Sequence, residues 1–418
     1  MRVVKGYKQT EVGVIPEDWE YLTIRDLISK ELIEKPKDGN HGNIHPTSGD
    51  FVENGIPFVM ANAVQNGYLD LPKCSCITKI QADGLQKGFS IEGDVLLTHK
   101  ATIGNTALVG KLDTNYIMLT PQVTYYRVKD KNSLSNKYLR HFFDSIGFQK
   151  VMAVKAGGGT RSYIGIVAQH ELPFVLPPTK AEQEAIAEAL SDADSLIESL
   201  QQLIAKKRQI KQGAMQELLQ PKPEWEEKTL GSFTSCTAGG TPSTQLSDYW
   251  GGSIPWMNSG ELNLKIVHDV TGRITELGLK NSSTKMIPSH CILIGLAGQG
   301  KTRGTVATNT IPLCTNQSIA AIYPNDQYCG DYLYYNLDSR YKELREQSTG
   351  DGGRGGLNLT IIKNLVIPFP SLKKQTRIAT ILSDMDSEIT ALETKLTKAQ
   401  QIKQGMMSEL LTGKTRLI

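Results

Sequence analysis

The chain has 418 residues, of which 39% are hydrophobic and 21% are charged, and its formal net charge is +3. This composition is sufficient for two cores of ordinary domain size, and it excludes a disordered chain. No apolar stretch of about 18 residues and no apolar signal-peptide core occurs, so we expect a cytoplasmic protein without a membrane partner.

Residues 1–178 are predicted to form a first α+β domain. Runs rich in Val, Leu and Tyr, such as GDVLLTH and QVTYYRV, are separated by Gly, Asn and Asp, which is typical of short strands. One helix is predicted near the end of this domain, around residues 138–151.

A polar, glycine-spaced segment at residues 35–50, KPKDGNHGNIHPTSGD, is the first candidate for contact with another molecule. Such segments offer donors and acceptors that can read base edges in DNA or bind its phosphates. The candidate DNA-binding residues of this domain are Lys35, Lys37, Asn40, His41, Asn43, His45, Lys100 in THKATIGN and Arg161 in GGGTR. An exposed loop without a partner is the alternative, and GGGTR is equally compatible with a hinge.

Residues 179–219 are predicted to form one long helix. Its apolar residues alternate between spacings of four and three, which is typical of a coiled-coil seam; they are Ile186, Leu190, Ala193, Ile197, Leu200 and Ile204. The first half of the helix is acidic, and Lys206, Lys207 and Arg208 follow.

Residues 220–370 are predicted to form a second α+β domain, with strands in CILIGLA and SIAAIYP and a helix around residues 332–345. Its polar loop is TAGGTPSTQ at residues 237–245, and its candidate DNA-binding residues are Thr241, Ser243, Thr244, Gln245, Lys301, Arg303 and Arg354.

The segment GLAGQGKT, Gly295 to Thr302, satisfies the P-loop pattern of nucleotide-binding proteins. A P-loop also requires a helix directly after it, whose N-terminus binds phosphate. The following residues, with Gly304, β-branched side chains and Pro312, form a poor helix. NTP binding through Gly295–Thr302 is therefore the alternative function, and a strand followed by a basic turn is favoured.

Residues 371–418 contain a second long helix with the same seam, formed by Ile378, Leu382, Met385, Ile389, Leu392 and Leu396. Its acidic residues also come early and its lysines late. Antiparallel packing of the two helices places acid opposite base at both ends, so we predict an antiparallel coiled coil. Two amphipathic helices that each lie on their own domain are the alternative.

The long helices belong to an internal repeat. Residues 180–219 and 372–411 are identical at 20 of 40 positions, including IKQGAMQELL and IKQGMMSELL. Weaker matches join EDWE to PEWE, TPQ at 120–122 to TNQ at 315–317, and NKYLRHFFDS to GDYLYYNLDS. About 39 helical residues span about 58 Å, the length of about 17 base pairs, so we predict a molecular ruler.

The chain resembles the specificity (S) subunit of Type I DNA restriction and modification enzymes, through both IKQGxMxELL helix ends, PPTKAEQEAI, PSLKKQTRIA and GGTPSTQLSDYWGGSIPW. The resemblance implies two tandemly repeated α/β target recognition domains, separated by two long helices. Each domain would read half of a split site in double-stranded DNA. It further implies two copies of a modification (methyltransferase) subunit and restriction subunits as partners, which carry S-adenosylmethionine, ATP and Mg.

No catalytic site is expected in this chain. The methyltransferase motif of Asn or Asp before Pro-Pro and an aromatic residue is absent, and the six cysteines lack CxxC spacing, so we expect reduced thiols and no metal site. Lys373 and Lys374 stand where the first helix has Ala181 and Glu182, so the two partner contacts need not be equivalent.

Overall fold

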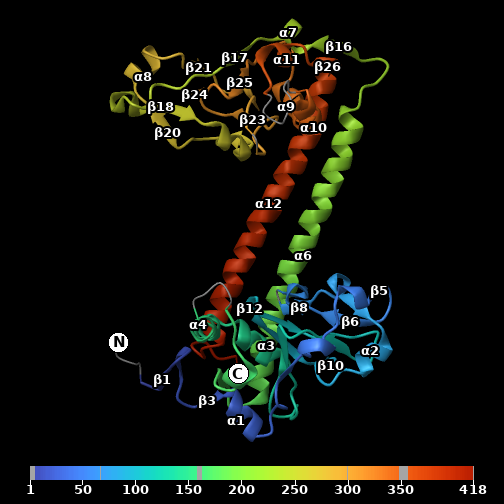
Figure 1. Ribbon diagram of the computed structural model, residues 1–418. Coiled ribbons are helices and arrows are strands. Elements are labelled where there is room, and N and C mark those ends of the chain that lie inside the picture. Colours follow the sequence, from blue (N-terminus) through green and yellow to red (C-terminus); the bar gives the residue numbers. More distant parts are fainter. Residues whose placement is uncertain (1–4, 66, 158–161, 299, 348–355, 418) are drawn as a thin grey trace. The chain divides into compact units, whose positions relative to one another are not determined.

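The structure is a computed structural model that describes the chain except for residues 1–4, 66, 158–161, 299, 348–355 and 418. It divides into two compact units: unit 1 comprises residues 1–200 and 395–418, and unit 2 comprises residues 201–394. Each unit contains one of the two predicted α+β domains, called a module below, and part of each of two long helices (Figure 1). The long helices are α6 (Lys180–Leu219) and α12 (Leu372–Leu410). Among the helices within the described ranges, none is both long and apolar enough to cross a membrane.

The module of unit 1 contains two sheets. The six-stranded sheet has the order β4 (Lys37–Asp38), β14 (Val123–Tyr126), β11 (Val95–Lys100), β12 (Thr102–Leu108), β8 (Gly67–Leu69), β7 (Val64–Gln65). The five-stranded sheet has the order β10 (Phe89–Ser90), β13 (Ile117–Leu119), β6 (Ile56–Val59), β9 (Ser75–Ile77), β5 (Phe51–Val52).

Among the described residues, this module also contains two antiparallel strand pairs, five α-helices and four short 3-10 helices. The pairs are β1 (Tyr7–Thr10) with β2 (Gly13–Pro16), and β3 (Glu20–Thr23) with β15 (Pro173–Leu176). The helices are α1 (Ile24–Ser29), α2 (Lys79–Asp83), α3 (Asn136–Asp144), α4 (Ile146–Lys155) and α5 (Ile166–Gln169).

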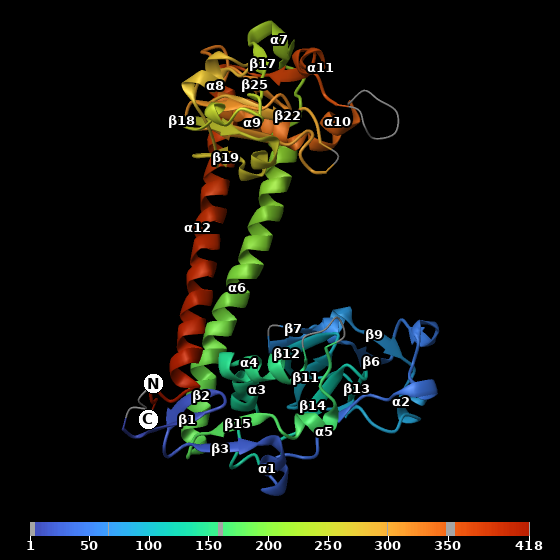
Figure 2. The same ribbon diagram turned by 60° about the vertical axis from the view of Figure 1, so that its left-hand side comes forward.

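Side chains alternate between the two faces of a strand. In the central strands of the six-stranded sheet, the side chains on both faces are buried. Val95 and Leu97 belong to the core that also contains Phe142 and Phe143 of α3. Leu96 packs on the opposite side with residues of the five-stranded sheet. Figure 2 shows α3 and α4 beside β11 and β12. The module is therefore a three-layer arrangement of helices, sheet and sheet.

Unit 2 repeats this arrangement. One sheet has the order β17 (Cys236–Ala238), β25 (Ile319–Ile322), β22 (Ile292–Gly295), β23 (Val306–Asn309), β19 (Ile266–Val267). The other has the order β20 (Gly272–Ile274), β18 (Trp250–Met257), β24 (Leu313–Thr315), β21 (Met286–Ile287). A separate pair joins β16 (Glu226–Thr229) to β26 (Val366–Phe369), and the short helices are α7 (Leu230–Phe233), α8 (Glu276–Lys280), α9 (Gly330–Ser339), α10 (Tyr341–Glu346) and α11 (Leu359–Lys363).

The prediction of a single helix near the end of each module is wrong, because each module has two consecutive helices there. The Ser145 backbone is extended between α3 and α4, and its side chain accepts a hydrogen bond from Phe148 N. Arg340 separates α9 from α10. A serine that can cap a following helix competes with helix continuation, which the apolar periodicity alone does not reveal.

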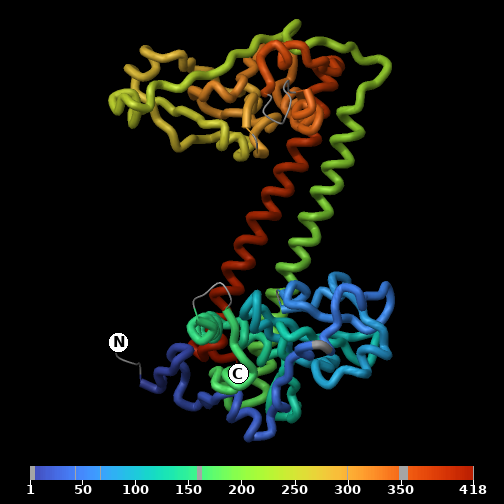
Figure 3. The backbone as a smooth tube through the Cα atoms, viewed as in Figure 1, coloured from blue at the N-terminus to red at the C-terminus, as the bar shows by residue number. Residues whose placement is uncertain are grey.

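The two long helices pack as an antiparallel coiled coil, as predicted, and each is unbroken (Figure 3). In unit 1, Asp194 of α6 is paired with Lys403 of α12. In unit 2, Lys207 is paired with Glu388 at 2.6 Å and Lys211 is paired with Asp386. All predicted seam residues are buried or half-buried; those buried most deeply are Ile186, Leu190, Ile204, Ile378, Leu382 and Ile389.

Strand register relates the two modules residue by residue. Val123 pairs with Thr98 as Ile319 pairs with Gly295, which makes Val123 and Ile319 equivalent. Residues 120–122 therefore correspond to residues 316–318, one residue later than the TPQ/TNQ match suggests. The shared Thr and Gln thus lie one residue out of register, because the hydrogen bonds between strands, and not residue identity, set the equivalence.

The repeated glutamines Gln183 and Gln375 tie each long helix to its module. The Gln183 carbonyl oxygen accepts from Ser135 N at 3.0 Å, and the Gln375 carbonyl oxygen accepts from Cys329 N at 2.9 Å. Ser135 and Cys329 both precede the first turn of the module helix. Both glutamines are buried, so their repetition has a structural cause.

Candidate nucleic-acid interface

The two polar loops predicted to contact DNA leave equivalent positions of the two modules. The first follows β4, and the second follows β17. Asp38 pairs with Thr124 as Ala238 pairs with Ala320, so Gly39 and Gly239 begin the loops at the same point of the sheet. A Cβ atom on Gly39 would lie 1.8 Å from Leu119 O, and one on Gly239 would lie 2.0 Å from Thr315 O. Glycine is required at both points because the backbones approach so closely.

The first loop contains exposed and buried members. Lys35, Lys37 and His41 are exposed, and His45 is half-buried with its ring 5.4 Å from that of Phe58. Asn43 lies in a short 3-10 helix, Gly42–Ile44.

The predicted exposure of Asn40 is wrong, because its side chain is only 2% exposed. Its carbonyl oxygen accepts from the backbone nitrogens of Gln86 and Lys87, and its amide donates to Lys87 O. Asn40 therefore holds two backbone segments together and is not presented to a base edge.

His41 rests on a buried carboxylate. Asp38 is 2% exposed, its carboxylate lies 2.7 Å from His41 Nε2, and it is also paired with Lys87. Two partners on one buried anion fix the start of the loop, and the exposed edge of the imidazole remains available to solvent.

Residues far apart in sequence form one hollow of about 520 Å³ in unit 1. Three predicted residues, His41, His45 and Lys100, line it. Sequence reasoning missed its other members: Gly42, Pro46, Thr47, Ser48, Phe51, Phe58, Met60, Thr120, Pro121 and Gln122. The TPQ repeat was the available signal for Thr120 and Gln122, but it pointed only to a common framework.

Lys100 is held at the end of the β11–β12 hairpin. Its backbone pairs with Tyr163, and its Nζ lies 5.9 Å from the Tyr163 ring centroid. The next residue, Ala101, has φ of 69°, which turns the chain sharply into β12. His99 beneath is fully buried, with Nδ1 2.9 Å from Ile164 O, and burial lowers the pKa of its imidazole. The cation of this hairpin is therefore Lys100.

In the second module, two tryptophans support the equivalent loop. The Trp256 indole donates to Gly240 O at 3.0 Å, and the Trp250 indole donates to Ser243 O at 3.0 Å. Thr241 donates its hydroxyl to the Gln317 side chain at 2.6 Å. Ser243 and Thr244 remain exposed. The loop backbone is thus anchored while its small polar side chains face solvent.

The segment Gly295–Thr302 belongs to a hairpin and not to a P-loop. β22 pairs with β23 in antiparallel orientation, so a strand stands where a phosphate-binding helix would be required. Lys301 is exposed, as the predicted basic turn requires. Arg303 differs from the exposed basic residue that the sequence predicts, because it is only 8% exposed. Arg161 and Arg354 lie outside the described residues.

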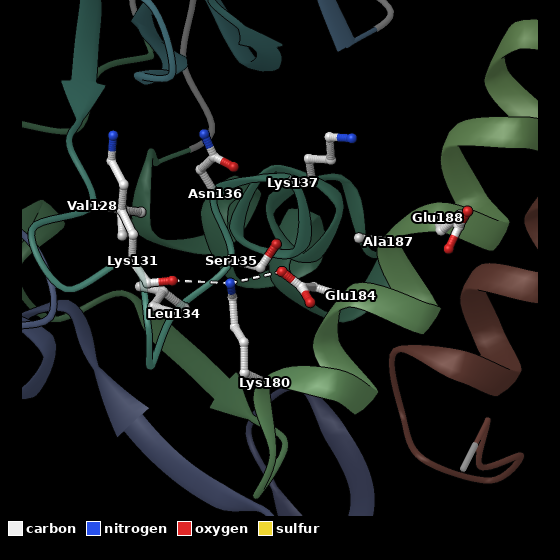
Figure 4. Close-up of a pocket in the computed structure, with 10 residues that line it drawn as sticks. All are labelled: Val128, Lys131, Leu134, Ser135, Asn136, Lys137, Lys180, Glu184, Ala187 and Glu188. Atoms are coloured by element: carbon white, nitrogen blue, oxygen red, sulfur yellow. Dashed lines mark hydrogen bonds and ion pairs between the residues drawn. The ribbon is translucent and has the colours of Figure 1, made fainter.

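A second hollow of about 500 Å³ lies in unit 1, where α3 and α6 begin (Figure 4). Lys180 donates to Lys131 O at 2.9 Å and to Glu184 at 2.8 Å, and Figure 4 shows its ammonium group between these two acceptors. Lys137 and Glu188 also line this hollow. Two carboxylates, Glu184 and Glu188, belong to its lining, and Lys180 is already paired with Glu184, so it is a weaker candidate for an anionic ligand.

Comparison with known proteins identifies the family. The family described as the Type I restriction modification DNA specificity domain matches twice, over residues 16–208 and 222–404. The type I restriction enzyme MjaX specificity subunit of Methanocaldococcus jannaschii is 25% identical to this chain. The match covers 99% of this chain and 97% of that subunit. The EcoR124I/EcoR124II specificity subunit of Escherichia coli is 26% identical over 66% of this chain and 69% of its own.

Two solved structures share the fold. The S subunit of a Type I restriction-modification system from M. genitalium has a TM-score of 0.61, 17% identity, and coverage of 98% of both chains. A chain from a study of type I complex assembly and conformational transition has a TM-score of 0.57, 16% identity, and coverage of 96% and 99%. The two modules, the antiparallel helices and the doubled family match agree, and the chain therefore belongs to the family of Type I restriction-modification specificity subunits.

Proposed function

We propose that each module reads one half of a split sequence in double-stranded DNA. The observation that carries this proposal is the equivalence of loops 39–45 and 239–245, which leave the same point of two repeated sheets but differ in sequence. A constant framework with different polar loops is what two readers of different half-sites require.

The antiparallel coiled coil would set the unread gap between the two half-sites. Its packing residues repeat in both helices, and its charges are paired within each unit. A stiff spacer of defined length permits simultaneous contact with two half-sites only at one separation.

We further propose that the chain recruits two modification subunits, and through them restriction subunits, in the cytoplasm. The relatives are named specificity subunits of type I restriction enzymes, which supports such partners. S-adenosylmethionine, ATP and Mg would then reside on the partner subunits, and this chain would supply recognition.

The test is to reconstitute the chain with its modification subunit and map methylated positions across a genome. A split motif with a constant gap is expected. Methylation without a common motif, or at one uninterrupted motif, would contradict the proposal. Exchanging loop 239–245 for another polar sequence provides a control, because it should alter only one half of the motif.

A further inference from the structure

The hollow that contains Lys100 has the chemical character of an anion site. Its polar lining comprises Lys100, two imidazoles, the Gln122 amide and three hydroxyl groups, and among the described lining residues there is no carboxylate. Lys100 is exposed, and its ammonium group can therefore reach a ligand in the hollow.

The nearest carboxylates along the loop are already occupied. Asp38 lies beneath the loop, where His41 and Lys87 pair with it. Asp50 accepts from Thr47 N at 2.7 Å and from the Thr47 hydroxyl at 2.9 Å, and these bonds lower the pKa of its carboxyl group. Because both carboxylates are committed to the loop itself, they oppose an incoming anion less than free carboxylates would.

Two polar atoms of the lining residues have no hydrogen-bond partner within the described part of the chain: the Thr120 hydroxyl and His45 Nδ1. Thr120 is only 4% exposed. Buried polar groups are normally satisfied, so such atoms beside a hollow call for a ligand or water.

The lining of the hollow also includes three apolar side chains, Phe51, Phe58 and Met60, and the centroids of the two phenyl rings are 6.2 Å apart. An inorganic anion alone would leave these apolar groups without a partner. A sugar-phosphate unit has both an apolar face and an anionic group, so it matches a lining of mixed character.

Shape also distinguishes the backbone of DNA from its base edges. Base edges lie at the floor of a groove and are reached by side chains that project outward. The sugar-phosphate backbone is a ridge on the outside of the duplex, and a concave surface accommodates a ridge. The Lys100 hollow therefore fits the backbone better than a base edge.

We propose that the hollow lined by Lys100, Thr120 and His45 holds one sugar-phosphate unit of the DNA backbone and so fixes the register of the first module on its half-site. This inference rests on the proposed function, and it assigns Lys100 to phosphate binding and not to base reading. By strand register its equivalent in the second module is Ala297, so the lysine is not repeated at that position.

The experiment uses the chain assembled with its modification subunit and DNA duplexes in which single phosphates are replaced by neutral methylphosphonate. In the wild type, replacement of one linkage in the first half-site should weaken binding. Lys100→Ala should weaken binding to all duplexes roughly 3- to 10-fold, and the salt slope should fall by about 1. In this variant the same methylphosphonate should cost nothing more.

Lys79→Ala, which removes an exposed lysine outside the hollow, is the matched control and should retain the methylphosphonate effect. Thr120→Val, which preserves side-chain shape, should reduce that effect without altering the methylated motif. A motif altered in its first half by Lys100→Ala would make Lys100 a base reader and overturn the inference, as would full additivity at every linkage. Absence of site-specific binding in the wild type would overturn the proposed function instead.

Discussion

At the scale of single residues, the ion pairs at the first turns of the long helices differ between the two repeats. Glu182 has a fully buried side chain paired with Arg416, whose guanidinium lies 5.7 Å from the Trp19 ring centroid. At the equivalent place in unit 2, Lys374 lies 5.1 Å from the Trp225 ring centroid. In each unit a cation thus lies near a tryptophan, Arg416 near Trp19 and Lys374 near Trp225. The cation comes from the C-terminal segment in unit 1 and from the long helix itself in unit 2.

Arg416→Ala is expected to destabilise unit 1 by about 3–5 kcal/mol, because it leaves the buried Glu182 carboxylate without its cation. Lys374→Ala should cost about 1 kcal/mol or less, since its partner Glu224 is exposed. Thermal unfolding of both full-length variants measures the difference. Equal melting temperatures for the two variants would show that the Glu182 pair has no special weight.

His141 lies in a buried ionic cluster between the first module and the long helices. Its Nε2 is 3.1 Å from the Ser191 hydroxyl, and Arg140 beside it is paired with Asp194 at 2.6 Å. Burial and the Arg140 charge lower the pKa of His141 to about 3. Burial opposes ionisation of Asp194, but Arg140 and Lys403 outweigh it and lower the pKa of that carboxyl group.

The depressed pKa of His141 predicts a loss of stability in mild acid. Below about pH 6.5 the unfolded imidazole binds a proton and the folded one does not, so the folded state is penalised by up to about 1.4 kcal/mol per pH unit. Unfolding free energies measured between pH 7 and pH 5 should fall more steeply for the wild type than for His141→Gln. Parallel pH profiles would mean that the pKa of His141 is the same in the folded and the unfolded chain.

At the scale of elements, apolar spacing determines which side chains form the seam between the two long helices. The order of charges determines whether the helices pack parallel or antiparallel. Both long helices carry the same seam, which is compatible with parallel or antiparallel packing. The equivalent pairs, Asp194 with Lys403 and Asp386 with Lys211, form only when the helices run in opposite directions. Tyr335 reinforces the second pair by donating to Asp386 at 2.8 Å.

Lys211→Glu should destabilise unit 2 by about 1–2 kcal/mol, because it places two carboxylates together beside Tyr335. The double variant Lys211→Glu with Asp386→Lys should recover most of this loss. Lys206→Glu, at an exposed position of the same helix, is the control for the altered net charge. Chemical denaturation of the four chains tests the pair, and failure of the double variant to recover would argue against it.

At the scale of the whole molecule, the proposed function makes recognition depend on a spacer shared by two readers. In that proposal the helices would set the gap through their length, and the module loops would set the sequence preference. These two properties should therefore vary independently.

Insertion of one heptad into α6 beside Leu200, together with one into α12 beside Lys398, should lengthen the spacer by about 10 Å while preserving the seam. The methylated motif should keep both half-sites and gain about three base pairs of gap. Mapping of methylated sites measures this directly. An insertion of two residues at each place breaks the seam and provides the control, and an unchanged gap in the heptad variant would exclude the ruler.

The doubled architecture, the long helices and their direction could be predicted from the sequence, because they follow from local periodicity and from the order of charges along one element. It also located both polar loops, since glycine-rich polar segments between apolar runs rarely belong to a core. It could not separate Asn40 and Arg303 from their exposed neighbours, because burial depends on segments distant in the chain.

Which loop residues meet depends on the tertiary structure. Lys100, His45 and Thr120 come from three separate segments, and strand pairing brings them to one hollow. Tertiary structure also corrected the TPQ match, because register is set by hydrogen bonds between strands. A strand fixes the direction of its own side chains, but its neighbours, and hence the site, depend on closure of the sheet.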